Sequence, residues 1–128
     1  FCFPRIIKIT DTSLEVKIKF NHRTRNHLNS MYFGVLSVGA DVTGGFLAMG
    51  YIRDSKSKIS LIFKDFQADF LKRADSNIVF ICNDSDIINE SVLRNLKNLK
   101  RENFTVSVAA FNQKDEIVSN FKLTTSIK

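Results

Sequence analysis

Apolar and polar residues alternate along most of this chain, and a period of two is typical of half-buried β-strands. The clearest run covers residues 13–20, and residues 5–10 lead into it through a short polar bend. Residues 104–110 and 117–127 show the same alternation on either side of a polar turn. That arrangement predicts a closing β-hairpin.

A longer alternating run, residues 58–70, changes phase in its middle. Apolar residues share one face as far as Phe63, and from Phe66 onward the alternation continues one residue out of phase. A β-bulge at Lys64 and Asp65 would return the apolar residues to one face and bend the strand. We therefore expect one long, bent strand here.

Between these runs, a continuous apolar segment and a helical pattern follow each other. Residues 77–82 are almost entirely apolar, which predicts a central strand covered on both faces. Ser85 or Asp86 can then cap a helix. Its apolar stripe consists of Ile88, Val92, Leu96 and Leu99. We expect a surface helix packed on the edge of the sheet.

The segment Met31–Ile52 interrupts the strand pattern. It holds all five glycines and both methionines of the chain, and Asp41 is its only formally charged side chain. At helical period, apolar residues occupy nearly every face, which predicts a long helix buried almost all round. Each glycine costs roughly 0.5 to 1 kcal/mol of helix propensity. Their accumulation indicates that another backbone or a ligand approaches this helix closely.

Asp41 needs an explanation because an isolated carboxylate in an apolar helix is costly unless it is paired, hydrogen-bonded or neutralised. One interpretation is a carboxylate with a perturbed pKa in a functional pocket. The other is a structural residue that caps a broken helix or pairs with an arginine.

The same segment is long enough to cross a bilayer, which takes about 20 apolar residues. A central aspartate costs roughly 2.5 to 3.5 kcal/mol in a membrane. The alternating strands also need an apolar element to cover. We therefore expect the segment to be a core helix and not a membrane span.

Composition indicates one globular domain over residues 1–128, because 44% of the residues are hydrophobic and 25% are charged. The chain begins with Phe instead of Met, so we expect that it lacks a short N-terminal segment. Cys2 and Cys82 are far apart in sequence and do not suggest a disulfide framework. A reducing cytoplasm is the expected location.

The chain carries 19 Lys and Arg against 13 Asp and Glu, a net charge of +6 that favours anionic partners. The basic residues are scattered instead of gathered on one element, so we expect no nucleic-acid partner. Affinity that falls steeply with salt would indicate otherwise. No phosphate-binding loop or metal-ligand spacing is present in the sequence. We therefore expect no metal site and no bound cofactor.

Two segments resemble a known family. RNHLNSMYFGVLSVGAD (residues 25–41) is similar to the core motif of PaaI-like acyl-CoA thioesterases, especially a poorly characterised branch filed as a domain of unknown function. FLKRADSNIV (residues 70–79) is similar to the family's bent-strand continuation, with Arg73 where a proline is usual. The resemblance spans the whole chain in element order. It implies an α+β hotdog fold, a bent antiparallel sheet wrapped around a long central helix, with one additional amphipathic helix.

The resemblance also implies roles for individual residues. Asp41 would be the catalytic carboxylate, as general base or nucleophile, and Asn26 would hold the water or the thioester oxygen. The backbone N–H groups at the start of the central helix would polarise the carbonyl. The family's usual His and first Gly are replaced at this helix start. The implied substrate-binding residues are His27, Tyr32, Phe33, Gly34, Lys72 and Arg73, the last two near the phosphates of coenzyme A.

The spacing of these residues separates the catalytic groups within one chain. Gly34 and Asp41 share a helix face but are about 10 Å apart along the axis at 1.5 Å per residue, too far to act on one carbon. The resemblance implies a homodimer, or a tetramer formed by two such dimers, in which Asp41 faces the partner's helix start. The expected function is hydrolysis of an acyl-CoA thioester at that interface. The alternative is a non-catalytic hotdog protein that binds a fatty acyl or other apolar ligand.

Overall fold

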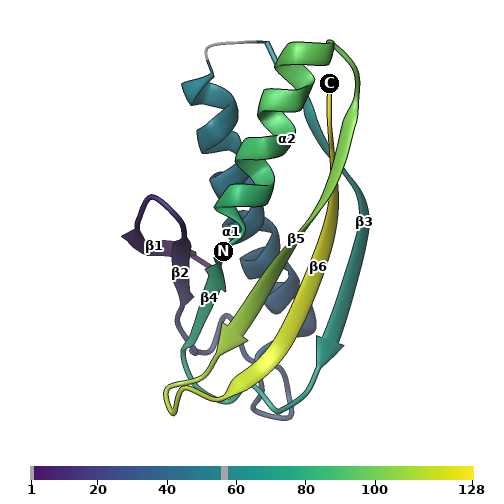
Figure 1. Cartoon of the computed structure of the whole chain (residues 1–128). Helices are drawn as coiled ribbons and strands as arrows, with labels where there is room; N and C mark the ends of the chain where they lie inside the picture. The colour runs from purple at the N-terminus through teal and green to yellow at the C-terminus, as the bar shows by residue number, and fades with distance from the viewer. Residues whose placement is uncertain (1, 56–57) are drawn as a thin grey trace.

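The computed structural model describes residues 2–55 and 58–128, and these residues form two helices and six strands (Figure 1). Helices and strands mix along the chain, as predicted for an α+β fold. In chain order the elements are β1 (Arg5–Ile9), β2 (Leu14–Ile18), α1 (Phe33–Asp54), β3 (Leu61–Phe70), β4 (Ile78–Cys82), α2 (Ser85–Asn98), β5 (Glu102–Phe111) and β6 (Ile117–Ile127).

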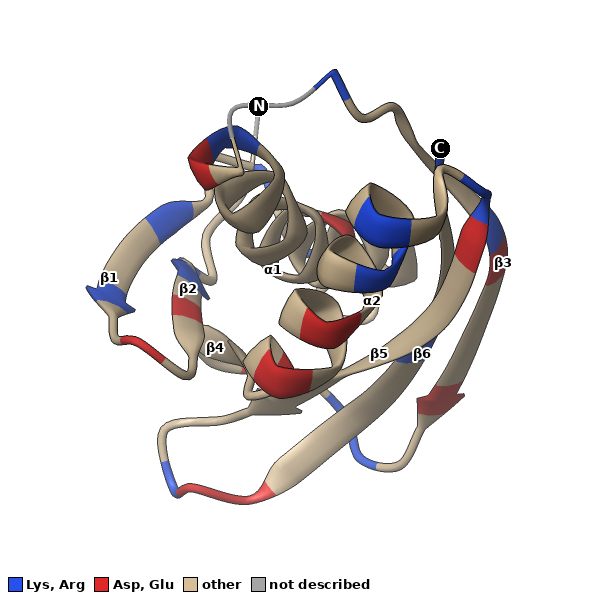
Figure 2. Ribbon diagram, turned by 45° about the horizontal axis from the view of Figure 1, so that its top comes forward, with Lys and Arg blue, Asp and Glu red and all other residues tan. Residues whose placement is uncertain are grey.

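The strands form one antiparallel sheet in the order β1-β2-β4-β5-β6-β3. Seen toward the ends of the helices, the sheet curves around α1 and α2, which lie side by side on its concave face (Figure 2). β1 and β3 are the two edge strands. The predicted arrangement of a bent sheet around a long helix is confirmed.

The predicted β-bulge is present in β3. Phe63 pairs with Thr125 and Asp65 pairs with Thr124 of β6, so Lys64 is the extra residue. The shift returns Phe66 to the inner face, where its ring packs against Phe121. The change of phase in the sequence therefore marks the bend correctly.

Three glycines of α1 lie where the sheet approaches the helix. A Cβ added at Gly39 would come within 2.2 Å of the ring of Phe80, which is fully buried. Gly44 lies under side chains of β5 and β6, and Gly45 lies against Phe63 of β3. The sheet does approach the helix closely at these positions, but it does so through side chains and not through the backbone or ligand that the sequence indicated. Gly34 and Gly50 face open space.

The expectation that α1 is buried almost all round is wrong for the single chain. Nine of its 22 residues are buried, and they face the sheet and α2. An open face remains because the sheet wraps around only part of the helix. The open face carries the exposed residues Gly34, Val38, Asp41, Phe46 and Met49.

By length and composition alone, α1 could also cross a membrane.

Four smaller expectations also need correction. β4 is not covered on both faces, because Val79 and Ile81 on its outer side are only half-buried. Asp84 is the N-cap residue of α2, and its carboxylate accepts a hydrogen bond from the backbone N–H of Ser107 instead of capping the helix. Leu99 follows α2 in the left-handed conformation and is 87% exposed, so it is outside the apolar stripe. α2 itself packs on the interior strand β5 and on α1.

Candidate active site

The start of α1 presents unsatisfied backbone N–H groups. Tyr32 is the N-cap residue, and no side chain caps the helix. The first backbone bond into the helix runs from the Leu36 N–H to the Tyr32 carbonyl. Among the described residues, the N–H groups of Phe33, Gly34 and Val35 therefore have no hydrogen-bond acceptor. Such a helix start attracts partial negative charge.

The two bulky residues at this helix start do not cover the open N–H groups. The Phe33 ring is 73% exposed and meets the ring of Phe70 edge-on, with the ring centroids 6.4 Å apart. Tyr32 is about half-exposed. A Cβ added at Gly34 would meet no atom within 4 Å, so the backbone there is open to an approaching group.

The loop before α1 is held by Asn26. Its side-chain Oδ1 accepts hydrogen bonds from the N–H groups of Leu28 at 2.9 Å and Ser30 at 3.1 Å. These bonds make Asn26 a turn residue, a role that asparagine commonly has in loops. Within the described part of the chain, the Nδ2 group of Asn26 has no acceptor and can donate to a ligand. His27, beside it, is exposed.

Arg73 is hydrogen-bonded to the loop at the start of α1, and Lys72 is not. The Nε of Arg73 donates to Ser30 Oγ in the loop before α1, and the N–H of Met31 donates to the Ala74 carbonyl at 2.6 Å. Lys72 instead pairs with Glu116, next to β6, and this hydrogen bond lowers the pKa of the Glu116 carboxyl. Both basic side chains are exposed.

Asp41 is an exposed carboxylate in the middle of α1, two turns from the helix start. Surrounding apolar groups keep water from part of the carboxylate, and this desolvation raises its pKa above the usual value of 3.8. No described residue forms an ion pair or a hydrogen bond with it. The alternatives of a helix cap or an arginine partner are therefore wrong for the described chain.

The predicted residues thus fall into two groups on one helix. Asn26, His27, Arg73 and residues 32–34 gather at the start of α1, and Asp41 lies about 10 Å farther along the axis. Within one chain, the carboxylate and the open N–H groups do not meet. The face of α1 that carries both the carboxylate and Gly34 is open to a second molecule.

One polar group near this end of the sheet was not predicted. The Oγ of Ser119 is fully buried and has no hydrogen-bond partner in the described structure. Ser119 pairs with Phe70 of β3 and is in phase with Phe121, whose ring packs in the core. The sequence does contain a signal for this residue, because Ser119 occupies an inward position of an alternating strand where an apolar residue is expected.

The chain resembles known proteins over nearly its whole length. Residues 2–127 match the family described as "Domain of unknown function (DUF4442)". No curated protein matches the chain.

Several solved structures share the fold. A Pseudomonas aeruginosa protein of unknown function, described as a probable thioesterase, aligns with a TM-score of 0.83 at 18% identity, over 98% of this chain and 82% of its own. A Haemophilus influenzae thioesterase aligns with a TM-score of 0.74 at 15% identity, over 98% and 78%. A Chlorobaculum tepidum protein of unknown function reaches 0.86 at 10% identity, over 98% and 82%. These similarities establish the hotdog fold.

Proposed function

The chain belongs to the family described as a domain of unknown function, DUF4442, and we propose that it is an acyl-CoA thioesterase whose active site forms between two copies of the chain. Asp41 carries the proposal. It is a solvent-accessible carboxylate with a raised pKa, on the same helix face as the uncapped N–H groups around Gly34. A carboxylate and a set of oxyanion donors are what thioester hydrolysis needs.

In the proposed reaction, the N–H groups of Phe33 and Gly34 bind the thioester carbonyl oxygen. Asp41 of the partner takes a proton from a water molecule, and the water oxygen attacks the carbonyl carbon. The tetrahedral intermediate collapses, the carbon–sulfur bond breaks, and the sulfur of coenzyme A leaves with the proton from Asp41, which returns to its carboxylate form. A free carboxylic acid and coenzyme A are the products, and the raised pKa of Asp41 makes it a better base.

A two-fold axis supplies the geometry. In a symmetric dimer, if residue i contacts residue j of the partner, then j contacts i. Antiparallel α1 helices that bring Asp41 to the partner's Gly34 therefore bring Gly34 to the partner's Asp41. The midpoint between these positions falls at Val38, which is exposed. The apolar open face of α1 and the free edge of β3 support this homodimer, which could pair further into a tetramer.

The remaining residues have supporting roles in this proposal. The free Nδ2 of Asn26 donates to the water or the thioester oxygen, and Tyr32 and His27 line the approach to it. Arg73 and Lys72 attract the phosphates of coenzyme A, which enters as part of the substrate. No other cofactor is required, and the cytoplasm is the proposed location because acyl-CoA substrates occur there.

The test is hydrolysis of a panel of acyl-CoA thioesters by the wild type and Asp41→Asn. We expect kcat to fall by about 10²- to 10⁴-fold, the usual contribution of a general base, while light scattering still shows a dimer. Asp86→Asn, an exposed aspartate on α2, is the matched control and should keep wild-type rates. Equal rates for wild type and Asp41→Asn would remove Asp41 from the mechanism.

A non-catalytic hotdog protein that binds an apolar ligand is the second candidate. The large exposed side chains of Tyr32 and Phe33, where related enzymes have His and Gly, favour it. This candidate predicts that no acyl-CoA is hydrolysed by the wild type although long-chain acyl-CoA binds. Measurable turnover that depends on Asp41 excludes it.

A further inference from the structure

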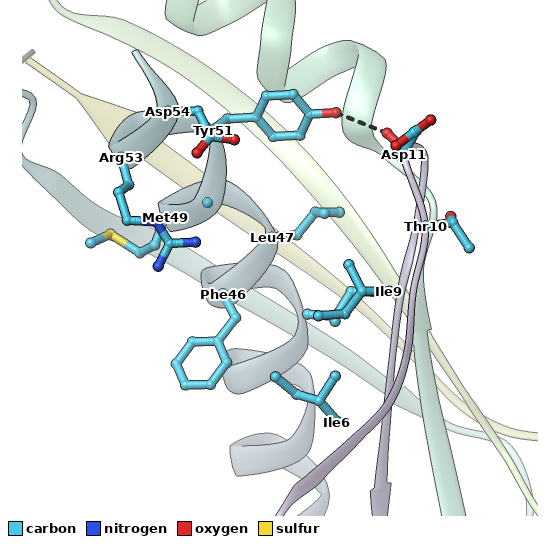
Figure 3. A pocket seen from close by; sticks show the side chains of 12 residues that line it. Ile6, Ile9, Thr10, Asp11, Phe46, Leu47, Met49, Tyr51, Arg53 and Asp54 are labelled. Carbon is cyan, nitrogen blue, oxygen red and sulfur yellow. Dashed lines mark hydrogen bonds between the residues drawn. The ribbon is translucent and has the colours of Figure 1, made fainter. Parts of the chain in front are cut away.

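A groove of about 800 Å³ lies between the β1–β2 hairpin and the C-terminal half of α1 (Figure 3). Its volume is in the range of sites for small organic ligands, about 300 to 1,000 Å³. It lies beyond Asp41, toward the end of the helix. The groove is lined by Ile6, Ile9, Thr10, Asp11, Leu14, Phe46, Leu47, Met49, Gly50, Tyr51, Arg53 and Asp54.

The walls of the groove are apolar. On the hairpin, Ile6 and Ile9 face α1, because their partners on β2, Val16 and Leu14, are buried in the core. On the helix, the side chains of Phe46 and Met49 are about half-exposed. The charged groups Asp11, Arg53 and Asp54 also line the groove, and all of them are exposed. Apolar surface left open on both walls favours an apolar occupant.

Two features hold the groove open. The Tyr51 hydroxyl donates a hydrogen bond of 3.0 Å to the Asp11 carbonyl, which ties the hairpin to α1 (Figure 3). Gly50 contributes no side chain, and a Cβ added there would meet no atom within 4 Å. The space beside Gly50 is therefore available to a ligand.

The groove is continuous with the Asp41 face of α1. Asp41, Gly45 and Met49 are four residues apart, so they form one row along the helix surface. Gly45 adds no side chain to this row, although the Phe63 ring of β3 lies beside it. Met49 is already part of the groove wall. Met49 lies about 12 Å beyond Asp41 at 1.5 Å per residue. A linear chain that starts at Asp41 and passes beside the Phe63 ring at Gly45 would reach the groove at Met49.

We infer that this groove binds the distal part of an unbranched aliphatic acyl chain whose thioester lies at Asp41. The inference rests on the proposed function and specifies its substrate class as acyl-CoA with a medium or long chain. An apolar, flexible occupant fits both the row along α1 and the apolar walls of the groove. Gly50 and Ile9 are then specificity-determining residues, because they set how much chain the groove accepts.

The first test measures kcat/KM for hexanoyl-CoA and dodecanoyl-CoA. A buried methylene contributes about 0.8 kcal/mol, or about a fourfold change in affinity. We expect the wild type to prefer dodecanoyl-CoA, and Gly50→Phe, which fills the groove from the helix, to reduce this preference at least tenfold. Ile9→Phe fills it from the hairpin and should shift the ratio in the same direction. The control Ile117→Phe, at an exposed position outside the groove, should keep the wild-type ratio.

The second test measures binding without turnover, by calorimetry in an Asp41→Asn background with dodecanoyl-CoA and hexanoyl-CoA below their micelle concentrations. Gly50→Phe should weaken dodecanoyl-CoA binding and leave the weaker hexanoyl-CoA binding nearly as it is. If no acyl-CoA is hydrolysed but this binding difference holds, the proposed reaction fails and the groove assignment survives. If turnover depends on Asp41 but neither filling variant changes the chain-length ratio or the binding, the groove assignment is overturned.

Discussion

At the residue scale, the open carboxylate of Asp41 is the most informative group in the molecule. A structural carboxylate on an apolar helix normally has a partner, because desolvation without compensation costs free energy. Asp41 has none among the described residues, and its pKa is raised. The chain therefore tolerates a destabilised ionised group at a position where a second molecule can reach it.

The raised pKa has a consequence for stability. The folded state binds the Asp41 proton more tightly than the unfolded state, where the pKa is about 3.9. The free energy of unfolding therefore falls as pH rises from the unfolded pKa through the folded one, and the full cost is present at neutral pH. We expect Asp41→Asn to raise Tm at pH 7.

Differential scanning calorimetry across pH checks this effect. The two proteins should approach the same Tm as pH falls below about 3.9, where Asp41 is protonated in both states. A lower Tm for Asp41→Asn at pH 7 would show that the ionised carboxylate has a stabilising partner.

Cys82 gives a second prediction at this scale. Burial of its thiol raises the pKa to about 11, so only about one thiolate in a thousand is present at pH 8. In a Cys2→Ser background, the native protein should react with a disulfide reagent such as DTNB far more slowly than the guanidinium-unfolded protein. Fast reaction of the native protein would mean that the β4 strand opens readily; Cys82→Ser supplies the baseline.

At the element scale, the glycines of α1 have different purposes although they look equivalent in sequence. Because Gly39 has no side chain, the helix packs directly against the Phe80 ring, whereas Gly50 faces open space. Helix propensity favours alanine over glycine at both positions by about 0.5 to 1 kcal/mol. The two positions differ only in what packs around the place where a Cβ would be added.

Gly39→Ala and Gly50→Ala form a matched pair that measures this difference. We expect Gly50→Ala to stabilise the protein by about 0.5 to 1 kcal/mol, because nothing opposes the gain in propensity. Gly39→Ala should destabilise it by about 1 to 2 kcal/mol, because a fully buried phenyl ring must move and overpacking costs about 1 to 3 kcal/mol. Urea unfolding gives both values, and equal signs would contradict the packing at Phe80.

At the scale of the whole molecule, the proposed dimer is the main expectation. Val38 lies near the proposed two-fold axis, so Val38→Glu would bring two added carboxylates together beside the Asp41 pair. Light scattering should then report a mass near 14.6 kDa instead of twice that value, and acyl-CoA hydrolysis should be lost with the dimer.

Ile87→Glu on α2 is the control for this change, because the exposed fractions of Ile87 and Val38 are almost equal, at 42% and 39%. It should leave the dimer intact. A dimeric Val38→Glu protein would place the interface elsewhere on the chain.

Much of the fold could be predicted because its determinants are local. The alternation in β2, β5 and β6 and the phase change at Lys64 each reflect which side of a strand faces the core. The burial of α1 was not predictable in this way. Its apolar residues occupy every face, so periodicity could not separate the side that contacts the sheet from the side left open.

For the candidate site, the sequence by itself determined which groups are available: a single carboxylate in an apolar helix, an asparagine loop before it, and glycines where a side chain would interfere. It could not determine how far apart these groups lie or what covers them. Only the tertiary structure decided that Asp41 is exposed, that Lys72 pairs with Glu116, and that a groove opens beside Gly50. The physical reason is that residue type follows local chemistry, whereas exposure and pairing depend on how far the curved sheet reaches around α1.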